Sequence, residues 1–273
     1  MTTDIQRYAA FAHDPEGGNP AGVVLDASAL DDAAMQAIAA DVGYSETAFV
    51  TARDGARLRV RYFSPLAEVP FCGHATVATA VALGPGEHLF ETNAGDVPVV
   101  VDEAGTATLT SVDPHVADLG ADDLTALLRA LRWSTGDLDP LLAPKVGFGG
   151  AYHPILAVTS RKRLADLDYD VPALKALMTE RDWTTVQLVF RAGVDEFDVR
   201  NPFPVGGVYE DPATGAAAAA FGGYLRELGL VAADATITLR QGDDMGRPSR
   251  ITVRLDPEIK GIRVSGAAVP IVS

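Results

Sequence analysis

Residues Phe71 to Leu83 read F-C-G-H-A-T-V-A-T-A-V-A-L, and residues Glu210 to Leu225 read E-D-P-A-T-G-A-A-A-A-A-F-G-G-Y-L. Each stretch reaches a glycine, Gly73 or Gly215, and continues through small apolar residues. Such residues are typical of a helix that is buried nearly all round. The two glycines lie about half of the 273-residue chain apart, as a duplicated architecture would place them. The pattern therefore predicts two similar halves, each built around one central helix.

The starts of these two helices also predict a binding site for a small organic acid. The first N–H groups of a helix lack intrahelical partners and carry a partial positive charge, so they attract a carboxylate. Ionisable side chains stand beside both starts: Cys72 and His74 at the first, and Asp211 at the second. We therefore expect an enzyme that holds a small acid next to chemically active groups.

Composition limits the classes of partner. The formal net charge of −15 argues against nucleic acid or an anionic membrane surface. No apolar run approaches the ~18 residues of a membrane span, and the first residues lack the basic and then apolar pattern of a signal sequence. The single cysteine excludes an internal disulfide and a cysteine-rich metal cluster. We expect a cytoplasmic protein with no nucleic-acid or membrane partner.

Short alternating stretches indicate strands between the helices. Residues 57–63, R-L-R-V-R-Y-F, alternate with the period of two of a half-buried strand. The other stretches of this kind are 46–52, 97–101 and 106–112. Residues 31–41 are helix-like, with Gly43 as the expected C-cap. Two stretches rich in glycine or proline, 113–123 and 134–150, are predicted to be a linker and a loop.

Five motifs, taken in their order along the chain, resemble a known family. They are G-N-P-A-G-V-V at 18–24, S-E-T-A-F-V at 45–50, F-C-G-H-A-T at 71–76, E-D-P-A-T-G at 210–215 and Q-G-D-D-M-G-R-P-S at 241–249. The ordered set resembles the phenazine-biosynthesis PhzF-like family of isomerases and epimerases. That family is similar in fold to diaminopimelate epimerase and proline racemase.

The resemblance implies an α+β fold of two pseudo-symmetric halves, each a mostly antiparallel sheet curled around its central helix. We expect the N-terminal half to span residues 1–115, completed by 266–273, and the C-terminal half to span 116–265. The active site is expected in the cleft between them, where ligand sites commonly form. The resemblance also implies a homodimer.

Glu46 is the expected catalytic acid/base. An isolated glutamate at the start of a strand is usually a solvated edge charge, but the S-E-T-A-F context resembles the family position that shuttles a proton. A carboxylate held in a closed cleft can take a proton from carbon and return it elsewhere. Ser45, directly before it, is expected to bind substrate.

His74 and Asp211 are the other expected catalytic residues. The partial charge at a helix start lowers the pKa of an imidazole, so a neutral His74 can orient a substrate hydroxyl or amine. Asp211 alone would be an ordinary charge in a first helical turn. The resemblance implies that it faces the glutamate across the substrate.

Cys72 permits a second interpretation. A cysteine at this place is one of two thiol bases in the racemase relatives, and a helix start favours the thiolate. A two-thiol racemase needs a second cysteine, and this chain has one cysteine in all. We therefore expect Cys72 to line the substrate site. An amino- or hydroxy-acid racemase or epimerase that uses Cys72 and Asp211 is the alternative.

The remaining residues are expected to anchor the substrate. Backbone N–H groups would come from Gly73, His74, Gly215 and Ala216, with the Thr214 hydroxyl and the Asn19 side chain nearby. The Gly-Asn-Pro sequence around Asn19 is also typical of a plain turn. Many members of the family carry serine where this chain has Ala216, which puts the phenazine-pathway substrate itself in question.

Other classes of function fit less well. Neither a dinucleotide-binding nor a P-loop glycine pattern is present. The five histidines show no short metal-ligand spacing, so we expect no metal and no cofactor. A catalytically silent protein that binds a small acid would have no need of the three polar side chains of the expected catalytic set. Together with these exclusions, the resemblance implies a cofactor-free isomerase that acts on a small carboxylate-bearing substrate.

Overall fold

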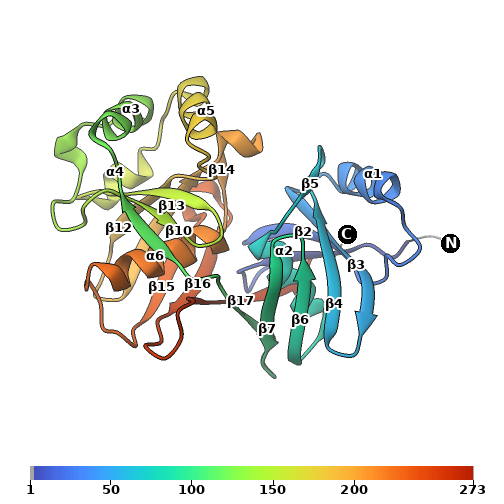
Figure 1. Ribbon diagram of the computed structural model, residues 1–273. Coiled ribbons are helices and arrows are strands. Elements are labelled where there is room, and N and C mark those ends of the chain that lie inside the picture. Colours follow the sequence, from blue (N-terminus) through green and yellow to red (C-terminus); the bar gives the residue numbers. More distant parts are fainter. Residues whose placement is uncertain (1–2, 273) are drawn as a thin grey trace. The chain divides into compact units, whose positions relative to one another are not determined.

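The computed structural model describes residues 3–272, and the chain divides into two compact units (Figure 1). The N-terminal unit contains the residues up to Thr110 and those from Ser265 onward, and the C-terminal unit is Ser111–Val264. The sequence predicted this boundary after residue 115. His115 instead belongs to the C-terminal unit, because it pairs with Phe148 of that unit.

The strands of the N-terminal unit close into a barrel. They are β1 (Gln6–Ala10), β2 (Asn19–Val24), β3 (Glu46–Asp54), β4 (Arg57–Phe63), β5 (Glu68–Val69), β6 (Gly86–Thr92), β7 (Gly95–Val101), β8 (Thr106–Thr110) and β17 (Arg263–Pro270). Hydrogen-bonded neighbours run in the order β1, β2, β3, β4, β6, β7, β8 and β17, and β17 pairs again with β1. Parallel pairing joins β2 to β3 and β4 to β6, so the sheet is mixed.

Helix α2 (Gly73–Leu83) is the axis of this barrel, in contact with β1, β2, β3, β7 and β8. Its residues from His74 to Ala80 are all buried, as the small side chains predict. The two threonines within it satisfy their hydroxyls on the preceding turn: Thr76 donates to the Cys72 carbonyl and Thr79 to the Ala75 carbonyl, each at 2.7 Å. A helix with these internal bonds can be enclosed without leaving its hydroxyls unpaired.

The other helix of this unit is α1 (Asp32–Val42), which lies between β2 and β3 in the chain (Figure 1). Asp31 caps it by accepting from the Ala34 N–H at 2.8 Å, and Gly43 ends it in a left-handed conformation with φ 70°. The predicted C-cap is therefore confirmed.

The C-terminal unit repeats this plan. Its strands are β9 (His115–Asp118), β10 (Lys145–Phe148), β11 (Tyr152–Ala157), β12 (Gln187–Arg191), β13 (Glu196–Pro202), β14 (Glu210–Asp211), β15 (Thr236–Gln241) and β16 (Ser249–Arg254). Its helices are α3 (Ala121–Leu131), α4 (Arg161–Ala165), α5 (Val171–Glu180) and α6 (Gly215–Glu227), with short 3-10 turns at Thr135–Asp137, Pro204–Gly206 and Asp243–Met245. Helix α6 is the central one, in contact with β9, β10, β11 and β16.

Two sequence expectations in this unit were wrong. The predicted linker 113–123 contains β9 and the start of α3, and the predicted loop 134–150 contains β10. The glycines of residues 134–150 are typical of a loop, which explains the second error. A side chain at Gly149 would lie 2.6 Å from the backbone of α6, so this glycine lets the chain pass close to the helix.

The order of pairing is the same in both units. In the N-terminal unit the pairs β1–β2, β3–β4 and β6–β7 are antiparallel, and β2–β3 and β4–β6 are parallel. In the C-terminal unit the pairs β10–β11, β12–β13 and β15–β16 are antiparallel, and β11–β12 and β13–β15 are parallel. The predicted α+β fold of two similar halves, each with a sheet around a central helix, is therefore confirmed. Within the described residues, no helix is long and apolar enough to cross a membrane.

Candidate functional site

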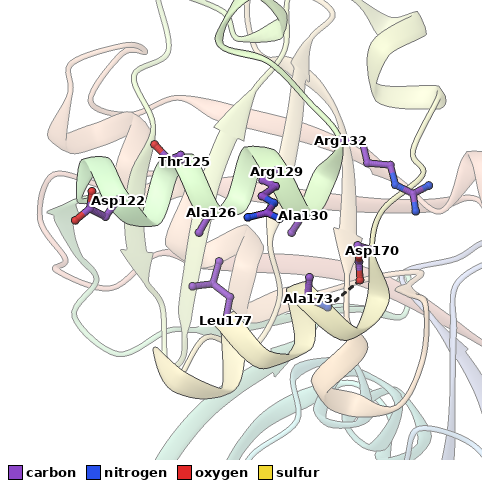
Figure 2. Close-up of a pocket in the computed structure, with 9 residues that line it drawn as sticks. All are labelled: Asp122, Thr125, Ala126, Arg129, Ala130, Arg132, Asp170, Ala173 and Leu177. Atoms are coloured by element: carbon purple, nitrogen blue, oxygen red, sulfur yellow. Dashed lines mark hydrogen bonds between the residues drawn. The ribbon is translucent and has the colours of Figure 1, made fainter.

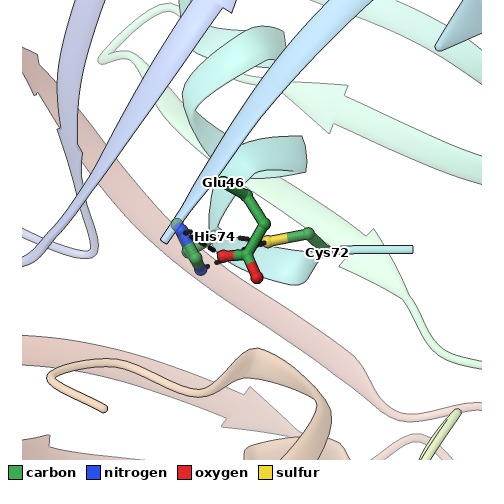
Figure 3. Close-up of side chains that lie close together, drawn as sticks. All are labelled: Glu46, Cys72 and His74. Atoms are coloured by element: carbon green, nitrogen blue, oxygen red, sulfur yellow. Dashed lines mark hydrogen bonds and ion pairs between the residues drawn. The ribbon is translucent and has the colours of Figure 1, made fainter. Parts of the chain in front are cut away.

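Three reactive side chains meet at the start of α2 (Figure 3). Glu46 is the first residue of β3, Cys72 is the N-cap of α2, and His74 is the second residue of that helix. A Glu46 carboxylate oxygen lies 3.4 Å from His74 Nε2 and 3.6 Å from Cys72 Sγ. The parallel pairing of β2 with β3 places Glu46 opposite Ala21, and α2 contacts both of these strands. The barrel thus holds a carboxylate, a thiol and an imidazole together.

The imidazole of His74 is buried and bonded on both nitrogens. The Asn19 amide lies 3.1 Å from Nδ1, and the Ser45 hydroxyl lies 3.3 Å from Nε2. With the amide nitrogen of Asn19 assigned to this contact, Nδ1 is the acceptor and the ring proton is on Nε2, facing Glu46. Burial lowers the pKa of His74, and the charge of Glu46 opposes that effect in part. His74 is therefore a neutral donor toward Glu46 at neutral pH.

Asn19 and Ser45 both contact the imidazole of His74. Asn19 is the first residue of β2 and is buried, so the interpretation as a plain turn was wrong. Ser45 immediately precedes β3 and shares His74 Nε2 with Glu46. The structure thus brings together the predicted residues of the N-terminal unit, which are Asn19, Ser45, Glu46, Cys72, Gly73 and His74.

The predicted residues of the C-terminal unit gather at the start of α6. Asp211 ends the short strand β14 and is buried, and the Thr214 hydroxyl donates to its carboxylate at 2.5 Å. Thr214 is the N-cap of α6, but its side chain makes no capping bond to the helix. Its hydroxyl instead holds Asp211, next to the first residues of the helix, Gly215 and Ala216.

Gln241 also belongs to this region, although its sequence motif did not predict its partners. It ends β15, and its amide nitrogen donates to the Asp211 carbonyl at 2.7 Å and to the Thr214 hydroxyl at 3.0 Å. Its amide oxygen accepts from the Thr214 N–H at 3.1 Å. Gln241 therefore fixes the segment that carries Asp211. It opens the fifth quoted motif, Q-G-D-D-M-G-R-P-S at 241–249.

An arginine–glutamate ion pair holds the short strand that precedes each central helix. Arg61 of β4 holds Glu68 of β5 through two bonds of 2.7 Å. Arg200 of β13 holds Glu210 of β14 through bonds of 2.9 and 2.5 Å. Each glutamate stands five positions before the glycine that starts its helix. The repeated E-x-P-x-x-G pattern is the sequence signal that could have identified these pairs.

The matching strand positions in the C-terminal unit carry no second acid/base cluster. Glu46 pairs with Ala21 of the preceding parallel strand, and the corresponding first residue of β12, Gln187, pairs with Ile155. The helix position that corresponds to His74, the residue after the initial glycine, is Ala216. The duplicated framework thus supports a carboxylate–imidazole pair in one unit and an aspartate–threonine pair in the other.

An open groove of about 480 Å³ lies elsewhere, between α3 and α5 of the C-terminal unit (Figure 2). It is lined by Asp122, Thr125, Ala126, Arg129, Ala130, Arg132, Asp170, Ala173 and Leu177. Asp170 serves there as the N-cap of α5, accepting from the Ala173 N–H at 3.0 Å. The groove contains none of the predicted site residues, so we place the candidate site at the start of α2 on chemical grounds.

Curated relatives match this chain over nearly its whole length. An uncharacterized isomerase of Deinococcus radiodurans is 36% identical, with 98% of this chain and 92% of the relative covered. The trans-2,3-dihydro-3-hydroxyanthranilate isomerase of Pseudomonas fluorescens is 31% identical, with 95% of this chain and 94% of the relative covered.

Solved structures agree with these relatives. The crystal structure of a PhzF-family phenazine biosynthesis protein from Bacillus anthracis matches with a TM-score of 0.86 at 28% identity, covering 98% of this chain and 96% of its own. A hydroxyproline epimerase from Agrobacterium vitis, at 14% identity, shares the fold with a TM-score of 0.67 over 98% of this chain and 90% of its own. The family model described as "Phenazine biosynthesis-like protein" (PhzC-PhzF) matches residues 8–273. The chain therefore belongs to the phenazine biosynthesis-like family, whose curated relatives are isomerases.

Proposed function

We propose that this isomerase works without a cofactor and moves a proton on a small carboxylate-bearing substrate, with Glu46 as the acid/base. The observation that carries the proposal is the contact of 3.4 Å between the Glu46 carboxylate and His74 Nε2. A carboxylate held beside a neutral imidazole can accept a proton from carbon and return it to another position on the same substrate.

His74 assists this transfer by donating from Nε2. Its burial and lowered pKa keep the ring neutral, so it orients Glu46 or a polar substrate group and does not compete for the proton. Ser45 adds a hydroxyl at the same nitrogen, 3.3 Å away. Asn19 fixes the other side of the ring.

The substrate carboxylate would bind at helix starts. Gly73 and His74 open α2, and Gly215 and Ala216 open α6, so their N–H groups lie in first helical turns. Asp211, steadied by Thr214 and Gln241, would be the second ionisable group that acts on the substrate. Ala216 offers only its backbone N–H, which favours a substrate that needs no side-chain hydroxyl at this position.

The substrate class rests on the site and on one relative. The relative from Pseudomonas fluorescens is named for trans-2,3-dihydro-3-hydroxyanthranilate, a hydroxylated ring acid. We propose a substrate of the same broad kind: a small carboxylate with a carbon-bound proton that an adjacent unsaturated group makes removable. A cytoplasmic homodimer is the expected working form.

Replacing Glu46 with glutamine tests the assignment of the acid/base. Each protein is incubated in D2O with trans-2,3-dihydro-3-hydroxyanthranilate and with a panel of small amino and hydroxy acids, and deuterium uptake and product are followed by NMR. On any compound that the wild type turns over, Glu46→Gln should be slower by about 100-fold or more. The free energy of unfolding should change little, because glutamine has nearly the same shape.

Glu87→Gln is the matched control. It makes the same chemical change at an exposed residue of β6 in the same unit, and it should leave turnover unchanged. A Glu46→Gln protein that is as active as Glu87→Gln would refute the role of Glu46.

A further inference from the structure

The Glu46, Cys72 and His74 cluster offers three different metal-ligand atoms. A carboxylate oxygen, a thiol sulfur and an imidazole nitrogen all lie within 4.8 Å of one another, and both Cys72 and His74 are buried. Cysteine, histidine and glutamate are the side chains that hold zinc in proteins. The sequence expectation of no metal rested on the spacing of histidines, which does not detect a mixed set drawn from β3 and α2.

The distances between these atoms match those around a four-coordinate zinc ion. Zinc bond lengths of about 2.3 Å to sulfur and 2.0–2.2 Å to nitrogen and oxygen place tetrahedral ligand atoms about 3.3–3.7 Å apart. In this protein Sγ of Cys72 lies 3.6 Å from Glu46 Oε2 and 3.8 Å from His74 Nε2, and the last two atoms are 3.4 Å apart. The sulfur also lies 3.3 Å from His74 Nδ1, so the Cys72 side chain would rotate toward Nε2 to complete three bonds, leaving the fourth position for water or substrate.

The surroundings of the cluster suit a bound cation. A metal-bound imidazole usually donates its other N–H to a polar group that sets its orientation. Asn19 already lies 3.1 Å from Nδ1 of His74. With a cation on Nε2, the ring proton moves to Nδ1, and the Asn19 amide must turn to present its oxygen to it.

We propose that Glu46, Cys72 and His74 bind a zinc-like divalent cation, and that the bound cation inhibits the enzyme. On binding, the Cys72 thiol releases its proton to solvent and its sulfur becomes a ligand. The inhibition rests on the proposed function, because the cation would occupy the Glu46 carboxylate that accepts the substrate proton. The binding itself does not depend on that function.

The ligand set also decides which cations bind. Thiolate and imidazole ligands favour zinc and its neighbours among the transition metals, whereas magnesium and calcium prefer sites made only of oxygen. Zinc should therefore bind tightly, cobalt more weakly in the same geometry, and magnesium not measurably at the same concentration. Substrate and zinc should exclude each other.

Cobalt titration of the full-length protein tests the site directly. Aliquots of CoCl2 are added under a reductant that contains no thiol, and the absorption spectrum is recorded. One equivalent should produce a sulfur-to-cobalt charge-transfer band in the near ultraviolet and the strong visible bands of a four-coordinate ion. Added ZnCl2 should abolish both, because zinc binds such ligands more tightly than cobalt does.

Three variants test the site: one removes a ligand, one removes the positioning residue, and one is a control. Cys72→Ser should remove the charge-transfer band and weaken zinc binding by roughly 100-fold or more, and Asn19→Ala should weaken it by about 10- to 100-fold with the band retained. His13→Gln removes an exposed imidazole of the same unit and should change neither the spectrum nor the affinity. A wild-type spectrum without the charge-transfer band, or equal zinc affinity in the wild type and Cys72→Ser, would overturn the proposal.

Binding and activity measurements separate this inference from the proposed function. If cobalt binds as described and Glu46→Gln is fully active, the metal site stands and the acid/base assignment fails. If Glu46→Gln is inactive and no sulfur-bound cobalt forms, the acid/base assignment stands and the metal site fails. If cobalt binds through sulfur but zinc leaves wild-type turnover unchanged, the inhibitory role is overturned.

Discussion

Cys72 has two neighbours that bear on its chemistry. Its sulfur lies 3.3 Å from His74 Nδ1 and 3.6 Å from a Glu46 oxygen. The first contact favours a thiol base, the role it would have in a racemase. The second puts the thiol next to a carboxylate that can itself carry the proton. Position alone is compatible with both chemistries, so activity must decide between them.

Replacing Cys72 with alanine separates these mechanisms. If Glu46 carries the proton, the variant removes one contact of the carboxylate and should keep turnover within about tenfold of the wild type, well above Glu46→Gln. Steady-state rates of both variants on one substrate provide the comparison. A loss as large as that of Glu46→Gln would favour the racemase. Substitution is cleaner than alkylation, whose added bulk can block the site.

At this scale the sequence predicted the residue types better than their partners. Glu46 and His74 lie 28 positions apart in the chain, and it is the pairing of β3 with β2 and the enclosure of α2 that bring them into contact. Short motifs marked each residue. Gln241 was missed as a partner of Asp211 because a buried amide at a strand end has no local pattern that names its partner.

At the scale of elements, the two central helices are preceded by similar short segments, here called arms. Each arm is a two-residue strand, β5 or β14, tied to the preceding strand by an arginine–glutamate pair. The pairs differ in burial. The side chains of Arg61 and Glu68 are 20% and 28% exposed, whereas those of Arg200 and Glu210 are 9% and 2% exposed. The same substitution, glutamate to glutamine, can therefore be compared in a partly exposed pair and in a buried pair.

Glu210→Gln and Glu68→Gln should therefore differ in cost. Breaking the buried pair leaves the Arg200 guanidinium with only Asp244, 4.0 Å away, as a charge partner, and should lower the free energy of unfolding by up to about 3–5 kcal/mol. The partly exposed Arg61 retains access to water and to Asp32, so Glu68→Gln should cost about 1 kcal/mol or less. Urea unfolding followed by circular dichroism measures both. Equal costs would contradict the assignment of the difference to burial.

Helices and strands whose sequences carry a periodic pattern or a cap were predicted well. Those that depend on contacts with distant residues were not. Strand β4 has an alternating sequence, and helix α1 has a cap at each end. The bounds of both lie within a residue or two of the expected ones. Strand β10 lacks such a signal because Gly147 within it and Gly149 just after it, which look like loop residues, are needed for close approach to α6. Closure of the N-terminal barrel by β17 joins the two ends of the chain, which no local pattern can indicate.

At the scale of the whole molecule, one of the two units has its own optical reporter. The chain has two tryptophans, Trp133 and Trp183, and both are buried in the C-terminal unit. Tryptophan fluorescence therefore follows the unfolding of that unit alone. Both side chains belong to a core formed with α3 and α5, so exposure of this core should change their emission.

The same unit contains a buried histidine that should make its stability depend on pH. His153 of β11 is fully buried, with Nδ1 2.9 Å from the Thr185 hydroxyl. Its Nε2 has no hydrogen-bond partner among the described residues. Burial lowers the pKa of His153 to about 4, whereas an unfolded histidine titrates near 6.5. Protonation on acidification would place an unpaired charge in the core.

The unfolded chain therefore takes up this proton at a higher pH than the folded unit does. The contribution of His153 to stability is fully present above about pH 6.5 and is lost as the pH falls toward 4. Between pH 7 and pH 5 the C-terminal unit should lose roughly 2 kcal/mol through this residue. In His153→Gln, the difference between the two pH values should shrink by that amount, whatever the variant costs at pH 7. His13→Gln, an exposed histidine outside this unit, should show the wild-type difference. Urea unfolding followed by tryptophan fluorescence at both pH values measures these differences, and an unchanged difference in His153→Gln would show that another group sets the pH dependence.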